Sequence, residues 1–234
     1  MSDMVPPGMT RRELRRRAEM LRETRTDATE EVVREQGREQ VRVLMVCTGN
    51  VCRSPLAEVT LRARMQGAPV RVHSAGTRAL IDRPMTSDAQ DLAVAHGAAA
   101  HDADEHRARW LLEPIAEDAD LILAMSREHR TSAVELAPRL LRQTFTIREF
   151  ARLAGALTDE EIASAADAAG TSPRARLAAV TALVVRQRGL TAPAPVEDDD
   201  VIDPYRRSRA TYERSAGQLI PAVDEVARVL RAAL

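Results

Sequence analysis

The chain has 234 residues, of which 44% are hydrophobic, enough apolar content to bury the core of one large domain or two small ones. Its 34 basic and 35 acidic residues leave a net charge of −1, which gives no support for a nucleic-acid or membrane-surface partner. The longest apolar run, residues 177–185, is about half of a membrane span. The two cysteines, Cys47 and Cys52, are too few and too close for a disulfide framework and have the wrong spacing for a zinc site.

Residues 1–40 form a charged N-terminal extension. Thr10 and Glu13 match a capping box that could open a helix, and its thin apolar stripe predicts a helix that docks on the body of the protein or on a sister chain, with a solvated tail as the alternative. Such docking would allow a homodimer through the extension. The segment lacks the apolar region of a secretory signal, so we expect a cytoplasmic protein.

From Val41 onward, short apolar segments alternate with helical patterns. Strands are predicted near residues 41–46, 70–73, 121–125 and 144–147, and helices near residues 55–65 and 86–96. Alternation of this kind indicates an α/β fold, in which helices cover a parallel sheet. Residues 41–234 are therefore predicted to form the main domain.

Residues 150–200 are predicted to be a helical insertion in this domain. Thr158 and Glu161 form a capping box, and Ser172 followed by Pro173 suits the start of a second helix. Residues 189–200, with two prolines and four acids, are predicted to be an exposed linker. A closing helix is expected at about residues 208–234.

The chemistry is concentrated in the loop from Cys47 to Pro55, where a strand passes into a helix N-terminus. Main-chain N–H groups and the helix dipole at such a turn can hold a tetrahedral oxyanion, and Arg53 can bind two of its oxygens. The same positive field predicts that Cys47 is a thiolate at neutral pH and hence a nucleophile. Ser54 could donate a hydrogen bond to it, and Gly49 is expected to supply a positive φ or a close backbone approach.

Cleavage of a phosphomonoester also needs a proton donor for the leaving oxygen. Our candidate is Asp203, in the segment Asp203-Pro204-Tyr205, where Pro204 stiffens the turn and Tyr205 could stack on a substrate ring. Spacing alone does not separate Asp203 from its neighbours Asp198, Asp199 and Asp200.

The segment Cys47–Pro55 resembles the signature loop of the low-molecular-weight protein tyrosine phosphatases, and Asp203-Pro204-Tyr205 resembles the general-acid loop of that family. The segments His73–Thr77 and Ala119–Met125 are also similar, in the same order. The resemblance covers residues 41–149 and 201–234. It implies a four-stranded parallel sheet flanked by helices and a reaction that needs neither metal nor cofactor.

The family resemblance also implies roles for individual residues. Cys47 would become phosphocysteine, Arg53 would hold the phosphate, and Asp203 would protonate the leaving phenol and then activate water. Asn50 would support the loop through Ser74 and His106, and Cys52 could form a reversible disulfide with the nucleophile or simply pack. The residues expected to contact a phosphorylated protein substrate are Thr48, Gly49, Asn50, Val51, Cys52, Ser54, Leu80 and Tyr205, with Ile81 beside Leu80.

Leu80 and Tyr205 would form the two walls of a slot, which suits phosphotyrosine better than phosphoserine. Three alternatives remain. A protein-arginine phosphatase is similar in sequence, but such relatives carry Thr where this loop has Val51. An arsenate reductase that uses a small thiol would need only Cys47 and would leave Asp203 without a role. A catalytically idle phosphate-binding module is disfavoured because Cys47, Arg53 and Asp203 are all present.

Overall fold

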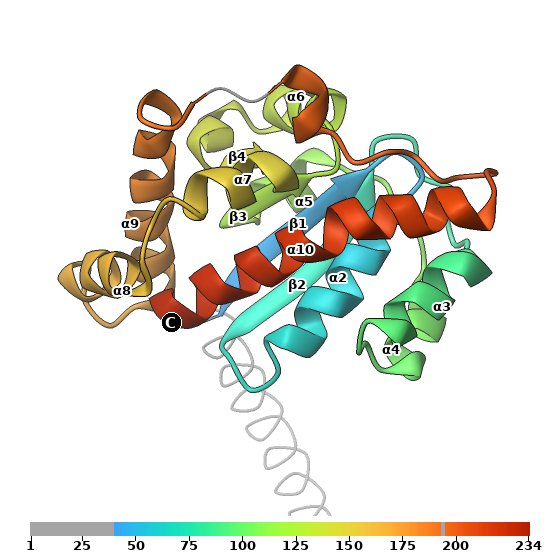
Figure 1. Cartoon of the computed structure of the whole chain (residues 1–234), viewed down its shortest axis with the longest axis horizontal. Helices are drawn as coiled ribbons and strands as arrows, with labels where there is room; N and C mark the ends of the chain where they lie inside the picture. Colours follow the sequence, from blue (N-terminus) through green and yellow to red (C-terminus); the bar gives the residue numbers. More distant parts are fainter. Residues whose placement is uncertain (1–39, 193–194) are drawn as a thin grey trace, which may run out of the picture. The chain divides into compact units, whose positions relative to one another are not determined.

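The computed structural model describes residues 40–192 and 195–234, and the helical extension predicted for residues 1–40 lies outside this part of the chain except for Gln40. The sheet has four parallel strands in the order β2-β1-β3-β4 (Figure 1). This confirms the predicted fold class. The strands are β1 (Val41–Cys47), β2 (Val70–Gly76), β3 (Leu121–Ala124) and β4 (Thr144–Thr146).

The central strand β1 is buried on both faces, as a parallel sheet between helices requires. Val43 and Met45 belong to the larger apolar core, on the side of α2 (Arg53–Arg64) and α10 (Arg209–Ala233). Leu44 and Val46 belong to a second cluster on the opposite face. That cluster also contains residues of α5 (Glu113–Glu117) and α6 (Arg127–Leu136).

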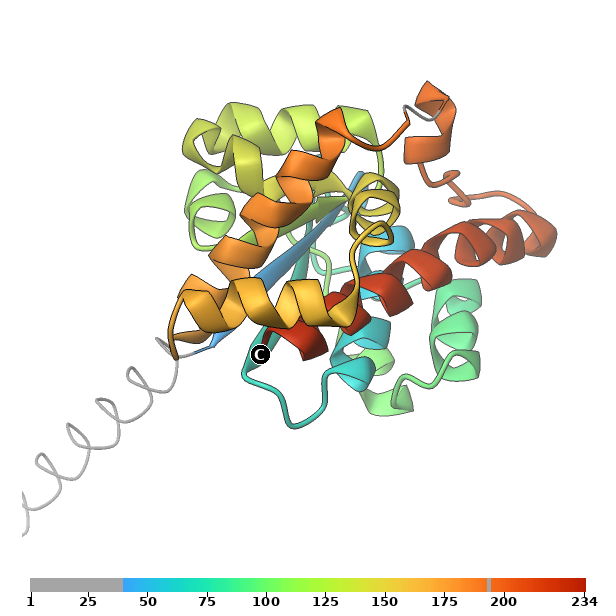
Figure 2. The same ribbon diagram turned by 60° about the vertical axis from the view of Figure 1, so that its left-hand side comes forward.

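The remaining helices follow the order expected from the sequence (Figures 1 and 2). The helix predicted near residues 86–96 is α3, and the two predicted in the insertion are α8 and α9. The elements not yet given are α3 (Ser87–Ala95), α4 (Ala100–Glu105), η1 (Pro138–Gln143), α7 (Ile147–Ala154), α8 (Asp159–Ala168), α9 (Pro173–Arg186), η2 (Gln187–Gly189) and η3 (Val196–Asp199).

Two helices begin with a reciprocal capping box. The box predicted at Thr158 and Glu161 opens α8, and a second one at Thr146 and Glu149 opens α7. The second box explains why β4 ends at Thr146, one residue before the predicted end of this strand. The Thr146 side chain accepts a hydrogen bond from the main chain of Glu149, which turns the chain into a helix.

The prediction of an exposed linker at residues 189–200 holds for Glu197 and Asp198, which are exposed, but is wrong for Asp199 and Asp200. Asp199 forms an ion pair with Arg152 of α7, and Asp200 forms one with Arg127 of α6. The Asp200 carbonyl also accepts a hydrogen bond from Arg148. Asp199 and Asp200 therefore attach this segment to α7 and α6. These contacts hold the chain just before Asp203.

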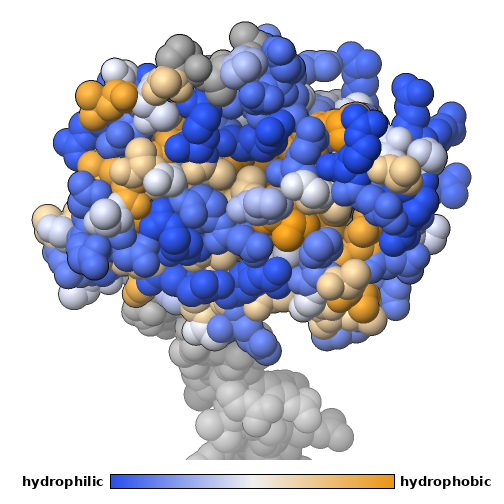
Figure 3. Space-filling view, in the orientation of Figure 1, coloured by the Kyte–Doolittle hydropathy of each residue, from blue (hydrophilic) through white to orange (hydrophobic). Residues whose placement is uncertain are grey.

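The closing helix α10 packs against α2, α7 and α8 (Figure 1). Its apolar stripe is buried from Tyr212 to Leu230, as its helical spacing predicts. Hydrophilic side chains dominate the face of the molecule in Figure 3. Within the described part of the chain, no helix combines the length and the apolar character that crossing a bilayer requires.

Candidate active site

The loop between β1 and α2 lies at the carboxyl end of the central strand. Helix α2 has Cys52 at its N-cap, but no side chain makes a capping hydrogen bond there, and its first turn contains no acidic residue. The N–H groups of the first turn are therefore left to bind an anion, and the helix dipole favours negative charge at this end.

Cys47, the predicted nucleophile, is 2% exposed and receives two hydrogen bonds at its sulfur. The Ser54 hydroxyl donates to Sγ at 2.9 Å and the Asn50 main-chain N–H donates at 3.3 Å. Ser54 Oγ accepts a hydrogen bond from Asn50 Nδ2 at 3.0 Å, so its own hydrogen is free to point toward the sulfur. Two donors aimed at one sulfur stabilise negative charge on it.

Arg53 connects the loop to the Asp203 segment. Its guanidinium is buried and lies 2.8 Å from Asp203 Oδ2, measured from Nη2. It also donates to the Val201 carbonyl at 3.0 Å and to Thr48 Oγ1 at 3.3 Å. The planar group is thus fixed in orientation beside Cys47, as bidentate binding of a phosphate requires.

The Asp203 segment is held by main-chain contacts on both sides. The Val201 N–H donates to the carbonyl of Met125, at the end of β3, and the Ile202 N–H donates to the side chain of Gln218 in α10. The Tyr205 N–H donates to Asp203 Oδ1 at 3.1 Å, which closes the turn around Pro204. Among the four acids that the spacing left open, the structure places Asp203 against Arg53.

A cavity of about 170 Å³ lies over Cys47, between Leu80 and Tyr205. The Leu80 N–H donates to the Gly49 carbonyl, which fixes that wall to the loop. Ile81, expected beside Leu80, does not line the cavity and is 56% exposed. The residues that line the cavity are Cys47, Thr48, Gly49, Val51, Cys52, Arg53, Arg78, Leu80, Asp203 and Tyr205.

Asn50 holds the loop from behind. Its Nδ2 donates to Ser74 Oγ at 2.7 Å, and its Oδ1 accepts from the Arg109 N–H at 2.9 Å. His106 Nε2 lies 2.8 Å from the Asn50 carbonyl. The structure therefore brings together Asn50, Ser74 and His106, as the family resemblance implies.

The positive φ of the loop falls on Asn50, at 56°, so the expectation that Gly49 would supply it is wrong. Asn tolerates the left-handed region better than most residues, and here its side chain is fully bonded. The tightest approach involves Gly76 instead. A Cβ at that position would lie 2.5 Å from the Thr48 carbonyl, so only glycine fits beside the loop.

Glu58 of α2 completes this network, and no sequence pattern singles it out. The Ser74 hydroxyl donates to Glu58 Oε2 at 2.5 Å, and His106 Nδ1 lies 3.6 Å from the same oxygen. Burial alone would raise the pKa of Glu58, but the hydrogen bonds from His106 and Ser74 outweigh burial and lower it. A buried carboxylate thus anchors Ser74 and His106.

His129, in α6, is a second residue that sequence reasoning missed. Its side chain lies 2.8 Å from Thr48 Oγ1 through Nε2 and 2.8 Å from Ser126 Oγ through Nδ1. Burial, followed by the nearby charge of Arg53, lowers the pKa of His129 to about 4. A neutral imidazole therefore positions Thr48, and only the Ser126 N-cap marks this helix start in the sequence.

Cys52 lines the cavity, and its sulfur also contacts the helices beside the loop. Its sulfur lies 3.4 Å from the hydroxyls of Thr86 and Tyr212, and burial raises its pKa. Both cysteines are free thiols. Cys52 therefore ties the loop to α3 and α10, and its redox role stays a prediction.

The chain is similar to known proteins in both sequence and structure. A sequence model of the family described as low molecular weight phosphotyrosine protein phosphatase matches residues 42–163. The low molecular weight protein-tyrosine-phosphatase Etp of Escherichia coli K12 is 29% identical over 188 residues, which cover 80% of this chain and 93% of that relative.

Two further relatives show the breadth of the similarity. The protein-arginine-phosphatase of Bacillus subtilis is 34% identical over 110 residues, 46% of this chain and 71% of its own length. The solved structure of the low molecular weight protein tyrosine phosphatase from T. tengcongensis matches with a TM-score of 0.55 and 29% identity, over 80% of this chain and 97% of that one.

Proposed function

Because this chain belongs to the low molecular weight phosphotyrosine protein phosphatase family, we propose that it removes phosphate from phosphotyrosine in proteins through a phosphocysteine at Cys47. The observation that carries the proposal is the meeting of three groups around one cavity. The Cys47 sulfur, the Arg53 guanidinium and the Asp203 carboxyl all line it, although Asp203 is 150 residues or more from the other two in sequence.

In the first step, the phosphate is held by the main-chain N–H groups of the loop and by Arg53. The Cys47 thiolate attacks phosphorus, so an S–P bond forms and the bond from phosphorus to the phenolic oxygen breaks. The Asp203 carboxylic acid gives its proton to that oxygen, and the phenol leaves. Asp203 is half-exposed at the mouth of the cavity, where a leaving group would lie.

In the second step, the same carboxylate takes a proton from a water molecule, and the water oxygen attacks phosphorus. The S–P bond breaks, inorganic phosphate forms, and its electron pair returns to sulfur as the thiolate. The hydrogen bonds from Ser54 and from the Asn50 N–H stabilise the sulfur both as nucleophile and as leaving group.

Leu80 and Tyr205 favour an aromatic substrate. Both line the cavity together with Cys47, which is 2% exposed, so a short phosphoserine side chain would not reach the sulfur. The guanidinium of Arg206 stacks on the Tyr205 ring at 5.2 Å from its centroid, which orients this wall. We therefore infer a preference for phosphotyrosine over phosphoserine.

Protein-arginine phosphatase activity is the second candidate, because one curated relative carries that name. Val51 lines the cavity and offers no hydroxyl to a phosphoramidate nitrogen or to a water, which favours phosphotyrosine. Arsenate reduction is disfavoured, because that reaction has no phenol for Asp203 to protonate. The cytoplasmic location and the homodimer through residues 1–40 stay predictions.

The decisive experiment compares kcat/KM for phosphotyrosine, phosphoserine and phosphoarginine in one peptide context. We expect turnover of phosphotyrosine, and a loss of roughly 10⁵-fold or more in Cys47→Ser, in which no thiolate can form. Comparable turnover of phosphoserine would contradict the aromatic preference inferred from Leu80 and Tyr205. A preference for phosphoarginine would show that the protein is a protein-arginine phosphatase. Val51→Thr is the matched variant, and we expect it to raise phosphoarginine turnover relative to phosphotyrosine.

A further inference from the structure

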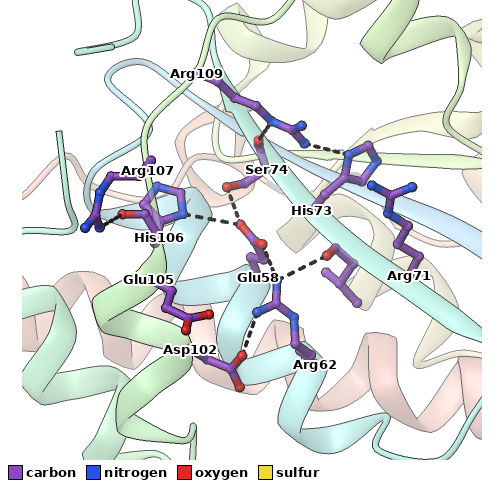
Figure 4. Close-up of a pocket in the computed structure, with 11 residues that line it drawn as sticks. Glu58, Arg62, Arg71, His73, Ser74, Asp102, Glu105, His106, Arg107 and Arg109 are labelled. Carbon is purple, nitrogen blue, oxygen red and sulfur yellow. Dashed lines mark hydrogen bonds and ion pairs between the residues drawn. The ribbon is translucent and has the colours of Figure 1, made fainter. Parts of the chain in front are cut away.

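A second cavity, of about 350 Å³, opens along the free edge of β2, behind the catalytic loop (Figure 4). It is larger than the cavity over Cys47. Four arginines line it, Arg62, Arg71, Arg107 and Arg109, together with the carboxylates of Glu58, Asp102 and Glu105. The proposed reaction uses none of these arginines directly.

The orientation of the β2 main chain follows from its ends. Strand β2 is an outer strand that pairs only with β1. The Gly76 N–H and carbonyl point outward, since they bond to Arg109 and Leu111, whereas the Thr77 N–H points inward to Cys47. Because alternate residues of a strand direct their main-chain groups to the same side, Val72 and Ser74 also point outward, into the cavity.

The outward carbonyls are already bonded, but the outward N–H groups are not. Arg109 Nε donates to the Ser74 carbonyl at 2.9 Å, and Arg62 donates to the Val72 carbonyl at 3.5 Å. No acceptor for the N–H of Val72 or Ser74 exists within residues 40–192 and 195–234. This stretch of edge therefore offers hydrogen-bond donors and no acceptors.

The side chains at the same edge add positive charge. Arg71 is exposed and has no hydrogen bond or ion pair within the described part of the chain. Arg109 donates to His73 Nδ1 at 2.8 Å, so Nε2 of a neutral His73 carries its hydrogen, and that buried atom has no partner. Burial, and then the charges of Arg109 and Arg71, lower the pKa of His73 to about 4.

The carboxylates on the other wall are largely neutralised. Arg62 binds both Glu58 and Asp102, and His106 and Ser74 also contact Glu58. Glu105 is exposed and lies on the side of the cavity away from Arg71 and Arg109 in Figure 4. Arg107 bonds only to main-chain carbonyls. The uncompensated charge at the β2 edge is therefore positive.

We propose that this cavity binds a small oxyanion, a phosphate or carboxylate group, through the N–H groups of Val72 and Ser74 and the guanidinium groups of Arg71 and Arg109. Such a ligand supplies the acceptors and the negative charge that this edge lacks. A guanidinium and free main-chain N–H groups are the usual partners of such anions.

The site is coupled to the catalytic loop through two residues. The Arg109 N–H donates to Asn50 Oδ1, and Ser74 Oγ accepts from Asn50 Nδ2. An anion that binds Arg109 and Ser74 therefore affects Asn50, the loop residue with a positive φ. Through Asn50 it changes turnover without entering the cavity over Cys47. Anion binding does not depend on the proposed function, whereas the effect on turnover does.

The test is a titration of the full chain, labelled with ¹⁵N, with inorganic phosphate and separately with citrate. The amide resonances of Gly49 and Val51 report phosphate in the catalytic loop, and those of Val72 and Ser74 report the β2 edge. We expect two binding curves with different midpoints. Comparing phosphate with citrate shows whether the edge takes phosphate or carboxylate groups.

Arg71→Ala removes a side chain that makes no hydrogen bond or ion pair in the described part of the chain, so the fold should be preserved. We expect it to weaken binding at the edge about tenfold or more and to shift the loop midpoint only by the smaller factor that couples the two sites. Arg186→Ala, which removes an exposed arginine of α9, is the matched control and should change neither curve.

Two results would overturn the site. In one, the Val72 and Ser74 resonances stay fixed, or follow the loop midpoint alone. In the other, Arg71→Ala binds both anions at the edge as the wild type does. Failure of the proposed phosphatase function would instead appear as absent turnover with these curves intact.

Discussion

The catalytic loop and the Asp203 segment meet at Arg53, yet they are held in different ways. In the loop, Cys47, Asn50 and Ser54 are buried and are bonded to one another through side chains. In the Asp203 segment, the carboxyl is half-exposed, and the chain is held by main-chain hydrogen bonds and by ion pairs of Asp199 and Asp200 near the surface.

This difference matches the demands of the two chemical roles. The nucleophile needs a fixed set of donors around a charge that develops at one point, so its support is buried and strong. The acid must approach leaving groups of different shape and exchange protons with water, so it lies at the surface on a short tethered segment. Substitutions in the loop should therefore lower both turnover and the free energy of unfolding, whereas substitution of Asp203 should lower turnover alone.

After Cys47→Ser, Asp203→Asn should have the largest effect on turnover, and it should have almost none on folding. The amide keeps the shape of the side chain but carries no acidic proton, so kcat for a phosphotyrosine peptide should fall roughly 10²- to 10⁴-fold. The loss should be smaller for p-nitrophenyl phosphate, whose leaving group needs less protonation. Steady-state kinetics with both substrates test this, and an equal loss for the two would argue against Asp203 as the acid.

Asn50→Ala should damage both turnover and stability. It removes the hydrogen bonds to Ser54, Ser74 and Arg109 and places alanine at a φ of 56°. We expect a loss of roughly 2–4 kcal/mol in the free energy of unfolding and of roughly 10- to 100-fold in kcat/KM.

Asn50→Gly is the matched control for Asn50→Ala, because glycine adopts this φ without strain. It should recover about 1 kcal/mol of stability relative to alanine, measured by urea unfolding, without restoring kcat/KM. Full recovery of turnover in Asn50→Gly would mean that the side chain of Asn50 does not position the loop.

His129 gives a pH-dependent test on the loop side. Its pKa of about 4 in the folded protein is below the ordinary value of 6.5, so the unfolded chain binds the proton more tightly. The stability contributed by neutral His129 is therefore present above pH 6.5 and is lost as the pH falls toward 4. Between pH 7 and pH 5, the wild type should lose roughly 2 kcal/mol more than His129→Gln in urea unfolding. Equal losses in the two proteins would show that His129 is not held neutral.

Arg152→Ala should have the smallest effect. It breaks the partly exposed pair with Asp199, and such pairs contribute about 0–1 kcal/mol. We expect kcat to change less than about threefold, since the main-chain bonds of Val201 and Ile202 remain. A large loss of turnover at unchanged stability would show instead that the ion pairs place Asp203.

The contrast between the two regions also explains what the sequence could predict. The loop is one contiguous segment between a strand and a helix, so its residues and their chemistry are readable locally. The parallel sheet and the capping box formed by Thr158 and Glu161 are predictable for the same reason. Asp203 stood among equal neighbours, and only the family resemblance selected it before the contact with Arg53 was seen.

The missed residues act across long sequence separations. Glu58 and Arg109 reach the loop only after β2 has paired with β1, and His129 reaches Thr48 from 81 residues away. No periodicity marks such contacts. The positive φ of the loop is at Asn50 rather than Gly49. Glycine would adopt this φ without strain, whereas at Asn50 the side-chain hydrogen bonds offset the strain.

The contacts of Arg53 with Val201 and of Cys52 with Tyr212 span 148 and 160 residues. During synthesis the ribosome delivers the loop well before Val201 and Tyr212, which follow it by about 150 residues. A nascent chain that has folded its first strands therefore has a reactive sulfur without its acid and without the helix that covers Cys52. The active site is therefore complete only after the Asp203 segment and Tyr212 have been synthesised, and a chain that terminates before them lacks activity.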